Sequence, residues 1–279
     1  MESVKLVQNY YDADVEKEWE RLEKHPFEFA LTCRFLDRYL HPGDRVLDIG
    51  GGPGRYSLYL AKRGCQVTLL DLSAENVEFA RRKAREQEIP LTAIAGDARE
   101  ADQLVEGKFD HVLLMGPLYH LTKERDRERC VQAALSLLRP GGTLSMSFIS
   151  MIANLIYALR EEPEQLLCEE SEQFAREHPD DMRYFQNLCN GEEYSGQAFT
   201  WAYFARAENI LSFVKRFPLE ILHFFAQEGV TAHNEDRLRE KPEEVRRVWL
   251  NLCESLCEKE EYRSWAEHLM VIARKKEVL

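Results

Sequence analysis

Between residues 45 and 149, short apolar segments alternate with amphipathic segments at helical spacing, and this alternation is the strongest constraint on the fold. The apolar segments are typical of buried strands and lie at 45–49, 66–70, 91–95, 111–115 and 143–149. Helices are expected between them at 56–63, 74–87 and 123–138. Strands that are connected through helices run parallel, with helices on both faces of the sheet. The sequence therefore predicts an α/β fold with a doubly wound sheet.

The flanking segments extend this plan to a single domain over residues 1–279. Helical spacing at 2–24 and 27–40 predicts an N-terminal helical segment (1–40) before the alternating core (41–150). Residues 151–199 are helical in pattern, so 151–205 is interpreted as an insertion. Alternation returns in the remainder (206–279), with helices at 207–216 and 242–257 and strands at 219–225 and 268–273. The sheet is expected to contain seven strands.

The charge and composition exclude several classes of protein. The formal net charge of −12 disfavours a nucleic-acid partner, because a polyanion is repelled at long range. No apolar run approaches the roughly 20 residues that cross a bilayer, so no membrane partner is expected. The N-terminus lacks a secretory pattern, and the seven cysteines form no C-x-x-C pair. We therefore expect a cytoplasmic protein with reduced thiols and no metal site; the sequence does not indicate an oligomeric state.

The most specific local motif is Asp48-x-Gly50-x-Gly52-x-Gly54, which joins the strand at 45–49 to the next helix. Glycines allow positive φ and let a ligand lie against the backbone, where a helix N-terminus offers free N–H groups. The dinucleotide pattern G-x-G-x-x-G fails in both registers, because its third glycine would fall on Arg55 or Ser57. The phosphate-binding P-loop also fails, since no Gly-Lys-Ser/Thr follows.

Acidic residues follow the next two strands. Asp71 ends the second strand, 21 positions after Gly50, where a carboxylate can accept hydrogen bonds from both hydroxyls of a ribose. Asp97-Ala98 follows the third strand. The fourth strand leads into 115–121 (Met-Gly-Pro-Leu-Tyr-His-Leu), and a Leu-Leu-Arg-Pro-Gly-Gly turn at 137–142 precedes the fifth.

This ordered set of motifs resembles the class I S-adenosylmethionine-dependent methyltransferases of the small-molecule type. The resemblance implies a Rossmann-like, mostly parallel sheet, an N-terminal helical lid and a helical cap, with S-adenosylmethionine as cofactor and S-adenosylhomocysteine as product. It assigns the cofactor's amino-acid end to Asp48, Gly50, Gly52 and Gly54, the ribose to Asp71 and the adenine to Asp97 and Ala98. Further contacts are expected from Leu72 and Met115, and from the lid residues Tyr11 and Arg21, one or the other of which would reach the cofactor's carboxylate.

The resemblance also implies the chemistry, an SN2 displacement of methyl from sulfonium to a small-molecule acceptor. The attacking atom (O, N or S) stays open. His120 is a candidate general base, or a residue that only orients its loop; Tyr119 either contacts the ligands or packs beneath the loop. The Asn/Asp-Pro-Pro-Tyr motif of base methylation is absent, since residues 116–119 read Gly-Pro-Leu-Tyr.

Several alternatives remain open at the level of sequence. Between 161 and 199, eleven acidic residues accompany two arginines, which predicts either a solvated surface or a trap for a cationic amine. Aromatic residues of the cap are candidates to line the acceptor pocket, and Cys253 and Cys257 are expected to be buried rather than to bind a soft metal. A non-catalytic cofactor-binding protein, or an enzyme that uses the sulfonium for cyclisation or aminopropyl transfer, fits the same motifs. The aromatic residues in question are Phe174, Tyr184, Phe185 and Trp201.

Overall fold

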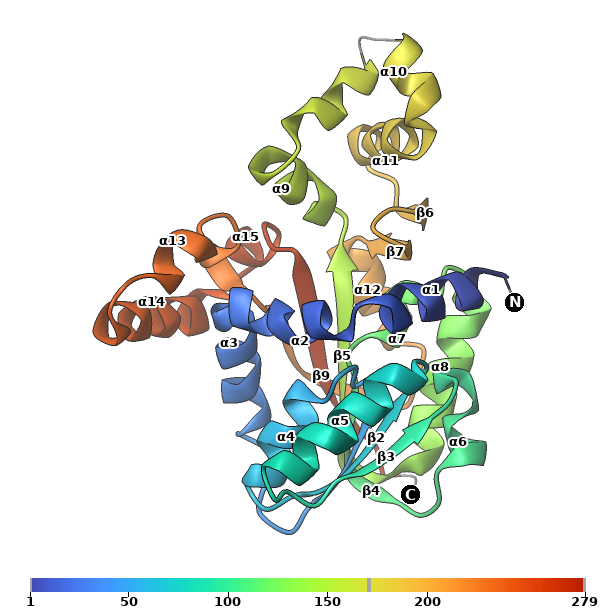
Figure 1. Ribbon diagram of the computed structural model, residues 1–279, viewed down its shortest axis with the longest axis vertical. Helices are drawn as coiled ribbons and strands as arrows, with labels where there is room; N and C mark the ends of the chain where they lie inside the picture. The colour runs from blue at the N-terminus through green and yellow to red at the C-terminus, as the bar shows by residue number, and fades with distance from the viewer. Residues whose placement is uncertain (1, 170–171, 278–279) are drawn as a thin grey trace.

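The computed structural model describes residues 2–169 and 172–277 (Figure 1). The strands are β1 (Arg45–Ile49), β2 (Gln66–Asp71), β3 (Thr92–Ala95), β4 (Phe109–Leu114), β5 (Leu138–Ser150), β6 (Tyr194–Gln197), β7 (Trp201–Ala205), β8 (Leu219–Ala226) and β9 (His268–Lys275). The helices before the cap are α1 (Glu2–Ala13), α2 (Val15–Lys24), α3 (Pro26–Leu36), α4 (Arg55–Lys62), α5 (Ala74–Glu86), α6 (Ala101–Leu104), α7 (Pro117–His120) and α8 (Glu124–Leu137). They are followed by α9 (Ala153–Arg160), α10 (Glu172–Glu177), α11 (Pro179–Asn190), α12 (Ala207–Val214), α13 (Glu235–Arg239), α14 (Glu243–Leu256) and α15 (Glu260–Arg263), with short 3-10 turns at 98–100, 163–169 and 229–231.

The strand order confirms the predicted doubly wound fold. Strands β3-β2-β1-β4-β5 are parallel neighbours, and β9 continues the sheet antiparallel to β5, with β8 antiparallel at its far side. The order reverses between β1 and β4, so a crevice opens at the carboxyl ends of these two strands. In open α/β sheets, ligands bind in that position.

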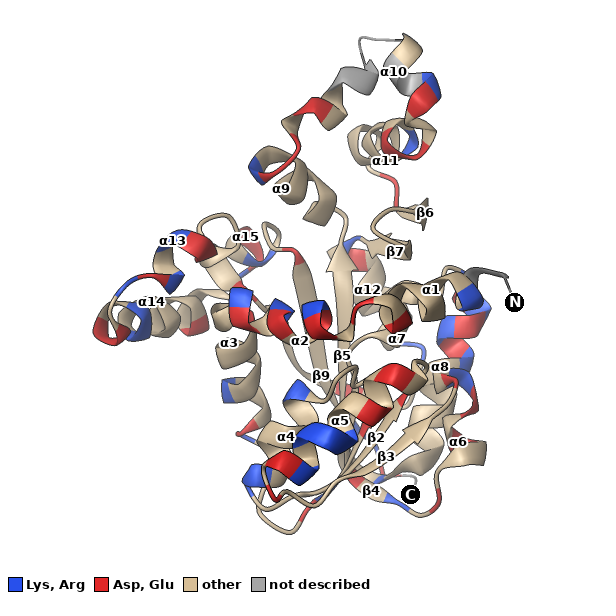
Figure 2. Cartoon of the chain, in the orientation of Figure 1, with Lys and Arg blue, Asp and Glu red and all other residues tan. Residues whose placement is uncertain are grey.

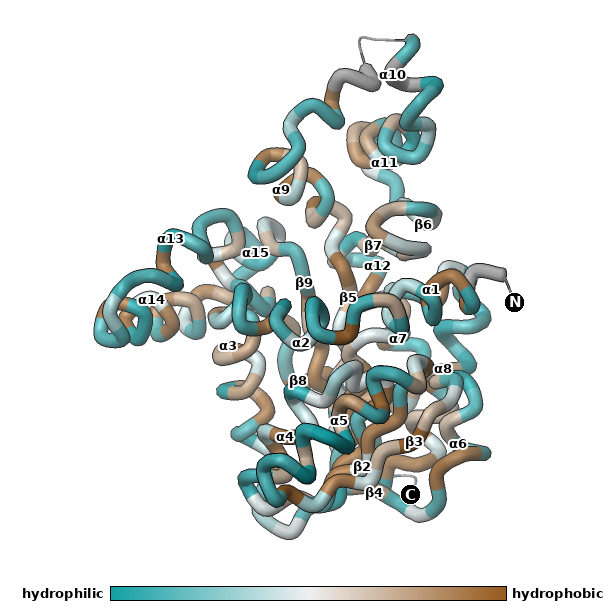
Figure 3. Tube along the Cα trace, viewed as in Figure 1, coloured by the Kyte–Doolittle hydropathy of each residue, from teal (hydrophilic) through white to brown (hydrophobic). Residues whose placement is uncertain are grey.

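The central strands are buried on both faces, which explains their continuous apolar sequences. Leu47 of β1, Leu114 of β4, Leu144 of β5 and Val271 of β9 are fully buried. Figure 3 shows apolar residues concentrated in the strands and polar residues on the surrounding helices. Helix α3 packs against the sheet through its Phe35 ring, which stacks on the Phe225 ring of β8 with a centroid distance of 3.9 Å.

The N-terminal segment contains three helices, and the predicted uninterrupted helix over 2–24 is wrong at Asp14. The Asp14 carboxylate accepts a hydrogen bond from the Lys17 backbone N–H at 3.0 Å and begins α2 as its N-cap. The next helix also ends at Leu36 rather than at residue 40. Helices α1 and α2 lie across the carboxyl ends of the strands, whereas α3 packs beside the sheet (Figure 1).

The insertion after β5 is not wholly helical. Helices α9, α10 and α11 project away from the sheet, and the chain returns through a β6–β7 hairpin that pairs with the end of β5 (Figure 1). Tyr184 and Phe185 lie in a small core inside this insertion, together with Tyr194 and Phe204, so the prediction that they line the ligand pocket is wrong. Phe174 lies outside the residues whose side chains are described.

In the view of Figure 2, acidic and basic residues lie mainly on the helices, and both signs occur on helices such as α2, α5 and α14. Cys253 and Cys257 are buried within the main core, as predicted. Across residues 2–169 and 172–277, none of the helices has the length and apolar character needed to traverse a bilayer.

Candidate cofactor and acceptor site

A cavity of about 1080 Å³, including its part open to solvent, lies between the glycine loop and the helices α1 and α2. Its walls come from the ends of β1, β2, β3 and β4, which is the crevice that the topology creates. Most of the predicted site residues line it together: Tyr11, Arg21, Asp48, Gly50, Gly52, Asp71, Leu72, Asp97, Ala98, Met115, Tyr119 and His120. Gly54 does not; it begins α4 with φ 91°, and a Cβ there would lie 3.1 Å from the Ala80 side chain. Its role in the structure is therefore the packing of α4 against α5.

The glycine loop needs glycine for two separate reasons. Gly50 has φ 74°, and a Cβ at this position would lie 2.4 Å from Cδ of Pro117. Gly52 has φ 55°, but a Cβ there would meet nothing within 4 Å, so its backbone borders open space. The loop thus presents bare backbone to the cavity at Gly52 and packs tightly against the β4 exit at Gly50.

Asp71 joins the loop to the end of β2. One carboxylate oxygen accepts from the Gly52 backbone N–H at 2.8 Å, and the other accepts from the Ser73 backbone N–H at 2.9 Å and the Asn76 side chain at 3.2 Å. Burial raises the pKa of Asp71, although these three donors oppose the rise. The carboxylate is therefore held rigidly at the cavity wall. Ser73 and Asn76 were not singled out from the sequence; Ser73 also caps α5, and an Ser-x-x-Asn pattern at a helix start could have indicated them.

Asp48 and Asp97 have different surroundings. Asp48 is fully buried behind the loop and accepts a hydrogen bond from the Ser57 hydroxyl at 2.7 Å; burial raises its pKa to about 6. Asp97 caps the 3-10 turn after β3 through the Arg99 N–H and forms an ion pair with the Arg99 guanidinium. The Arg99 guanidinium therefore already donates hydrogen bonds to the Asp97 carboxylate that is assigned to adenine, whereas Ala98 lines the cavity.

Helix α1 is attached on both sides of the cavity. Asp12 accepts a hydrogen bond from the Ser73 hydroxyl beyond β2, and the Tyr11 hydroxyl lies 2.8 Å from Nε2 of His120 beyond β4. Helix α2 is fixed by Arg55 of the glycine-loop helix, which donates to the Trp19 carbonyl oxygen at 2.9 Å. These contacts hold α1 and α2 over the cavity.

Arg21 points from α2 into the cavity wall but is already paired with acidic residues. Its guanidinium donates to both carboxylate oxygens of Glu28, at 2.8 and 3.1 Å, and its Nε donates to Glu18 at 3.2 Å. Burial alone raises the pKa of Glu28, but the neighbouring Arg21 and His268 charges outweigh it and lower the pKa to about 2. Arg21 keeps N–H groups beyond these three bonds, so a contact with the cofactor's carboxylate stays a prediction.

His120 is held by two partners that fix its tautomer. The Trp201 carbonyl oxygen, 3.2 Å from Nδ1, can only accept, so Nδ1 carries the proton and Nε2 accepts from the Tyr11 hydroxyl. Burial lowers the pKa of His120 to about 4, and the contact with the Trp201 carbonyl opposes this only partly. At neutral pH the imidazole is therefore uncharged and joins α1, α7 and β7. Tyr119 stands beside it with a ring-centroid distance of 4.7 Å.

This geometry predicts that His120 positions the lid. We expect Tyr11→Phe to speed amide hydrogen exchange in α1 by about fivefold, since one hydrogen bond contributes about 1 kcal/mol. Tyr10→Phe is the matched control, because the Tyr10 hydroxyl makes no hydrogen bond with the described part of the chain. A methyl-transfer rate that falls as the pH drops through the pKa of His120, about 4, and that loses this inflection in His120→Ala, would instead identify His120 as a general base.

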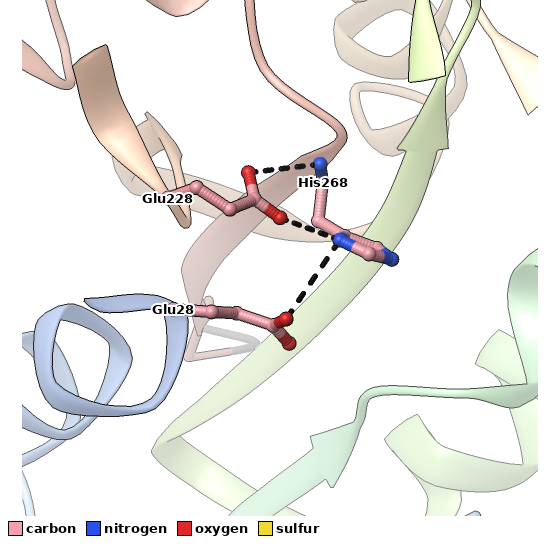
Figure 4. A group of neighbouring side chains, drawn as sticks. All are labelled: Glu28, Glu228 and His268. Atoms are coloured by element: carbon pink, nitrogen blue, oxygen red, sulfur yellow. Dashed lines mark hydrogen bonds and ion pairs between the residues drawn. The ribbon is translucent and has the colours of Figure 1, made fainter. Parts of the chain in front are cut away.

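One group of functional interest was missed by sequence reasoning. Glu28, Glu228 and His268 come from α3, the segment after β8 and the start of β9, and they meet next to Arg21 and Tyr119 (Figure 4). The one sequence signal was a histidine at the first position of an apolar strand. Its partners lie far apart in the chain and could not be paired with it from the sequence.

Comparisons with known proteins agree with the fold and the motifs. A protein family described as a methyltransferase domain matches residues 46–142. The ubiquinone biosynthesis O-methyltransferase of Xanthomonas campestris pv. campestris (strain B100) is 37% identical over 109 residues, which are 39% of this chain and 44% of that protein. The glycine/sarcosine N-methyltransferase of Parasynechococcus marenigrum (strain WH8102) is 27% identical over 212 residues, 72% of this chain and 75% of that one.

Solved structures show the same fold at low identity. Magnesium protoporphyrin IX methyltransferase from Synechocystis PCC 6803 with bound S-adenosylhomocysteine aligns with a TM-score of 0.58 at 16% identity, covering 98% of this chain and 100% of that one. The [4+2]-cyclase SpnF aligns with a TM-score of 0.51 at 20% identity, covering 86% and 77%. The fold thus occurs in proteins with different reactions.

The family match lies in the cofactor-binding part of the chain, and its residues 46–142 include the glycine loop, Asp71, Asp97 and the β4 exit. The match to the ubiquinone O-methyltransferase spans less than half of that relative's length, whereas the match to the N-methyltransferase extends further. Residues 46–142 thus belong to a methyltransferase domain family, and the fold and motifs around them are those of the class I S-adenosylmethionine-dependent methyltransferases.

Proposed function

We propose that the chain binds S-adenosylmethionine in this cavity and transfers its methyl group to a small-molecule acceptor, releasing S-adenosylhomocysteine. The observation that carries the proposal is the convergence, in one cavity, of bare loop backbone at Gly52, the rigid Asp71 carboxylate and the Asp97-Ala98 turn. Each comes from a different strand exit. The sulfonium of the cofactor supplies the reactive methyl group, so the protein needs chiefly to bind and align.

The charges of the cavity suit a cationic cofactor. Asp71, Asp97 and Glu18 line it, whereas Arg21 and Arg55 are engaged with the acidic residues Glu28 and Glu23. Carboxylates near the cavity favour a positively charged ligand, and the low dielectric of a covered site strengthens this effect. The hydrogen bonds of α1 to both walls hold this helix over the cavity, which would limit the access of water to a bound cofactor.

A small-molecule acceptor is the class that the surroundings favour. Beyond the cofactor residues, the cavity is lined by Tyr11, Tyr119 and His120, whose rings contact one another. The Phe199 ring, in the turn between β6 and β7, lies 5.8 Å from that of His120. The relatives named above, by their names, include an O-methyltransferase and an N-methyltransferase, so the attacking atom stays open. The formal net charge of −12 disfavours a polynucleotide acceptor.

The decisive experiment identifies the nucleoside product. Purified protein is incubated with S-adenosylmethionine and a panel of phenols, amines, amino acids and thiols, and the nucleosides are identified by mass spectrometry. We expect S-adenosylhomocysteine in amounts that depend on one acceptor class. Methylthioadenosine would instead indicate cyclisation or aminopropyl transfer, and saturable cofactor binding without any product would indicate a non-catalytic binding protein; either result would overturn methyl transfer.

A further inference from the structure

His268 is held between two buried carboxylates at the edge of the site. Its Nδ1 lies 2.5 Å from Oε1 of Glu228 and 4.0 Å from Oε2 of Glu28, and its backbone N–H donates to the other Glu228 oxygen at 3.1 Å (Figure 4). Both glutamates are at most 3% exposed. One edge of the imidazole is therefore fully committed to these acids, and the ring orientation is fixed.

The fold places this ring at the acceptor end of the sheet. His268 pairs with Ile149 near the carboxyl end of β5, which is the edge where ligands bind in sheets of this kind. Its ring centroid is 6.3 Å from that of Tyr119, which lines the cavity. The imidazole is thus next to a side chain of the cavity wall, and it lies on the β5 side of the sheet, away from β2 and β3, which carry the residues assigned to ribose and adenine.

The second ring nitrogen is available. Nε2 of His268 makes no hydrogen bond with the described part of the chain, and the side chain is 19% exposed. Figure 4 shows this nitrogen on the side of the ring that faces away from both carboxylates. Burial alone lowers the pKa of His268, but the Glu228 and Glu28 charges outweigh it and raise the pKa to about 9. At neutral pH the free nitrogen therefore carries a proton to donate.

The neighbouring groups add further donors. The Arg21 guanidinium, on α2, is bonded to Glu28, and the Tyr119 hydroxyl, on α7, makes no hydrogen bond with the described residues. From the other side, Glu267 faces the cluster but is paired with Arg160 at 3.0 Å. His25, at the start of α3, is likewise paired, with Glu235 at 3.0 Å. Glu18, a carboxylate that lines the cavity, accepts a hydrogen bond from Arg21. The groups without a partner among the described residues, Nε2–H of His268 and the Tyr119 hydroxyl, are donors, which an anionic oxygen group complements.

A metal ion is the competing occupant, because the ligand atoms of Glu28, Glu228 and His268 lie within 4.8 Å of one another. Both Glu28 oxygens, however, already accept from Arg21, at 2.8 and 3.1 Å. Nδ1 of His268 is likewise taken by Glu228. A cation would have to displace two charge-assisted interactions and lie close to a guanidinium, so the arrangement favours an organic anion.

We propose that Nε2–H of His268, oriented by Glu28 and Glu228, binds a carboxylate of the methyl acceptor, so that the acceptor is a small carboxylic acid. This inference rests on the proposed function, since it assigns the substrate class of the same site. Tyr119 is placed to donate a second hydrogen bond to that carboxylate.

The test measures carboxylate binding directly. Protein saturated with S-adenosylhomocysteine is titrated with acetate, glycine and benzoate, and with the corresponding amides, which have similar shapes but lack the carboxylate. Histidine ring signals are followed by NMR, and those of His268 are assigned with His268→Gln. We expect at least one acid to bind about tenfold or more tightly than its amide, to shift the His268 signals, and to lose this advantage in His268→Gln.

The pH dependence gives a second readout. Because the pKa of His268 is raised, the imidazolium is fully present at pH 7, and the preference for the acid should disappear as the pH rises through about 9. Glu228→Gln retains an oxygen for Nδ1–H but removes a charge, so the preference should disappear at a lower pH. A preference that grows above pH 9 would contradict the proposal and identify His268 as a base.

The controls separate this proposal from the proposed function. His41→Gln, at an exposed histidine, should behave as the wild type, and His268→Gln should bind S-adenosylhomocysteine with unchanged affinity. No binding of S-adenosylhomocysteine to the wild type would overturn the proposed function itself. Normal binding of it, with no acid preferred to its amide, would overturn only the role of His268. A divalent metal that is bound at one ion per chain in the wild type, and is absent from His268→Gln, would also overturn this role of His268.

Discussion

Asp71→Ala is expected to weaken the binding of S-adenosylhomocysteine by about 10- to 100-fold. The carboxylate would accept from the ribose hydroxyls, and hydrogen bonds to a charged group contribute about 1.5–3 kcal/mol. Asp71 also accepts from the Gly52 and Ser73 backbone N–H groups, so its loss loosens the loop as well. Isothermal titration calorimetry measures the affinity, and thermal unfolding shows whether the variant is folded.

Two further variants test whether the loss of affinity comes from the Asp71 carboxylate itself. Asp71→Asn preserves the shape and one acceptor oxygen, so a smaller loss of affinity is expected. Asp110→Ala is the matched control: Asp110 likewise accepts from a backbone N–H, that of Arg45 at 2.7 Å, but outside the cavity, where β1 begins. Unchanged affinity in folded Asp71→Ala would contradict the assignment of the ribose to Asp71.

Gly50→Ala is expected to lower the free energy of unfolding by about 2–5 kcal/mol and to abolish measurable cofactor binding. The positive φ of 74° costs a non-glycine residue about 1–2 kcal/mol. The new Cβ would also lie 2.4 Å from Cδ of Pro117, and overpacking of this kind costs about 1–3 kcal/mol. The loop or the β4 exit must move, and both form the cavity. Denaturant unfolding measures the loss of stability, and isothermal titration calorimetry measures the loss of cofactor binding.

Gly43→Ala separates backbone strain from the clash. Gly43 has φ 94°, but a Cβ there would meet nothing within 4 Å, and it lies outside the cavity. This control should be destabilised by only about 1–2 kcal/mol and should bind S-adenosylhomocysteine like the wild type. If Gly50→Ala bound S-adenosylhomocysteine as tightly as Gly43→Ala does, the glycine loop could not form part of the binding site.

The sheet and the cofactor side of the cavity could be predicted because their signals are local. The buried strands β1, β2 and β4 have continuous apolar sequences, and each leads directly into a site residue, such as Gly50 or Asp71. In a doubly wound sheet, adjacent strand exits necessarily lie together. Local sequence and topology are therefore sufficient to bring these residues into one cavity.

The acceptor side could not be predicted, since it depends on contacts between distant segments. Nothing near His120 in the sequence indicates that Tyr11 and the Trp201 carbonyl fix its tautomer. The β6–β7 hairpin was read as helix because its strands are short and follow a long helical stretch. Glu28 and His268 are 240 positions apart, and only the sheet order brings them together.

Calorimetric titration of the purified protein with S-adenosylhomocysteine tests most directly whether the cavity at the glycine loop binds the S-adenosyl nucleoside. We predict saturable binding at one site per chain, with micromolar or tighter affinity in the wild type and a large loss in Asp71→Ala. Heats that stay at the level of dilution up to millimolar ligand would contradict this prediction.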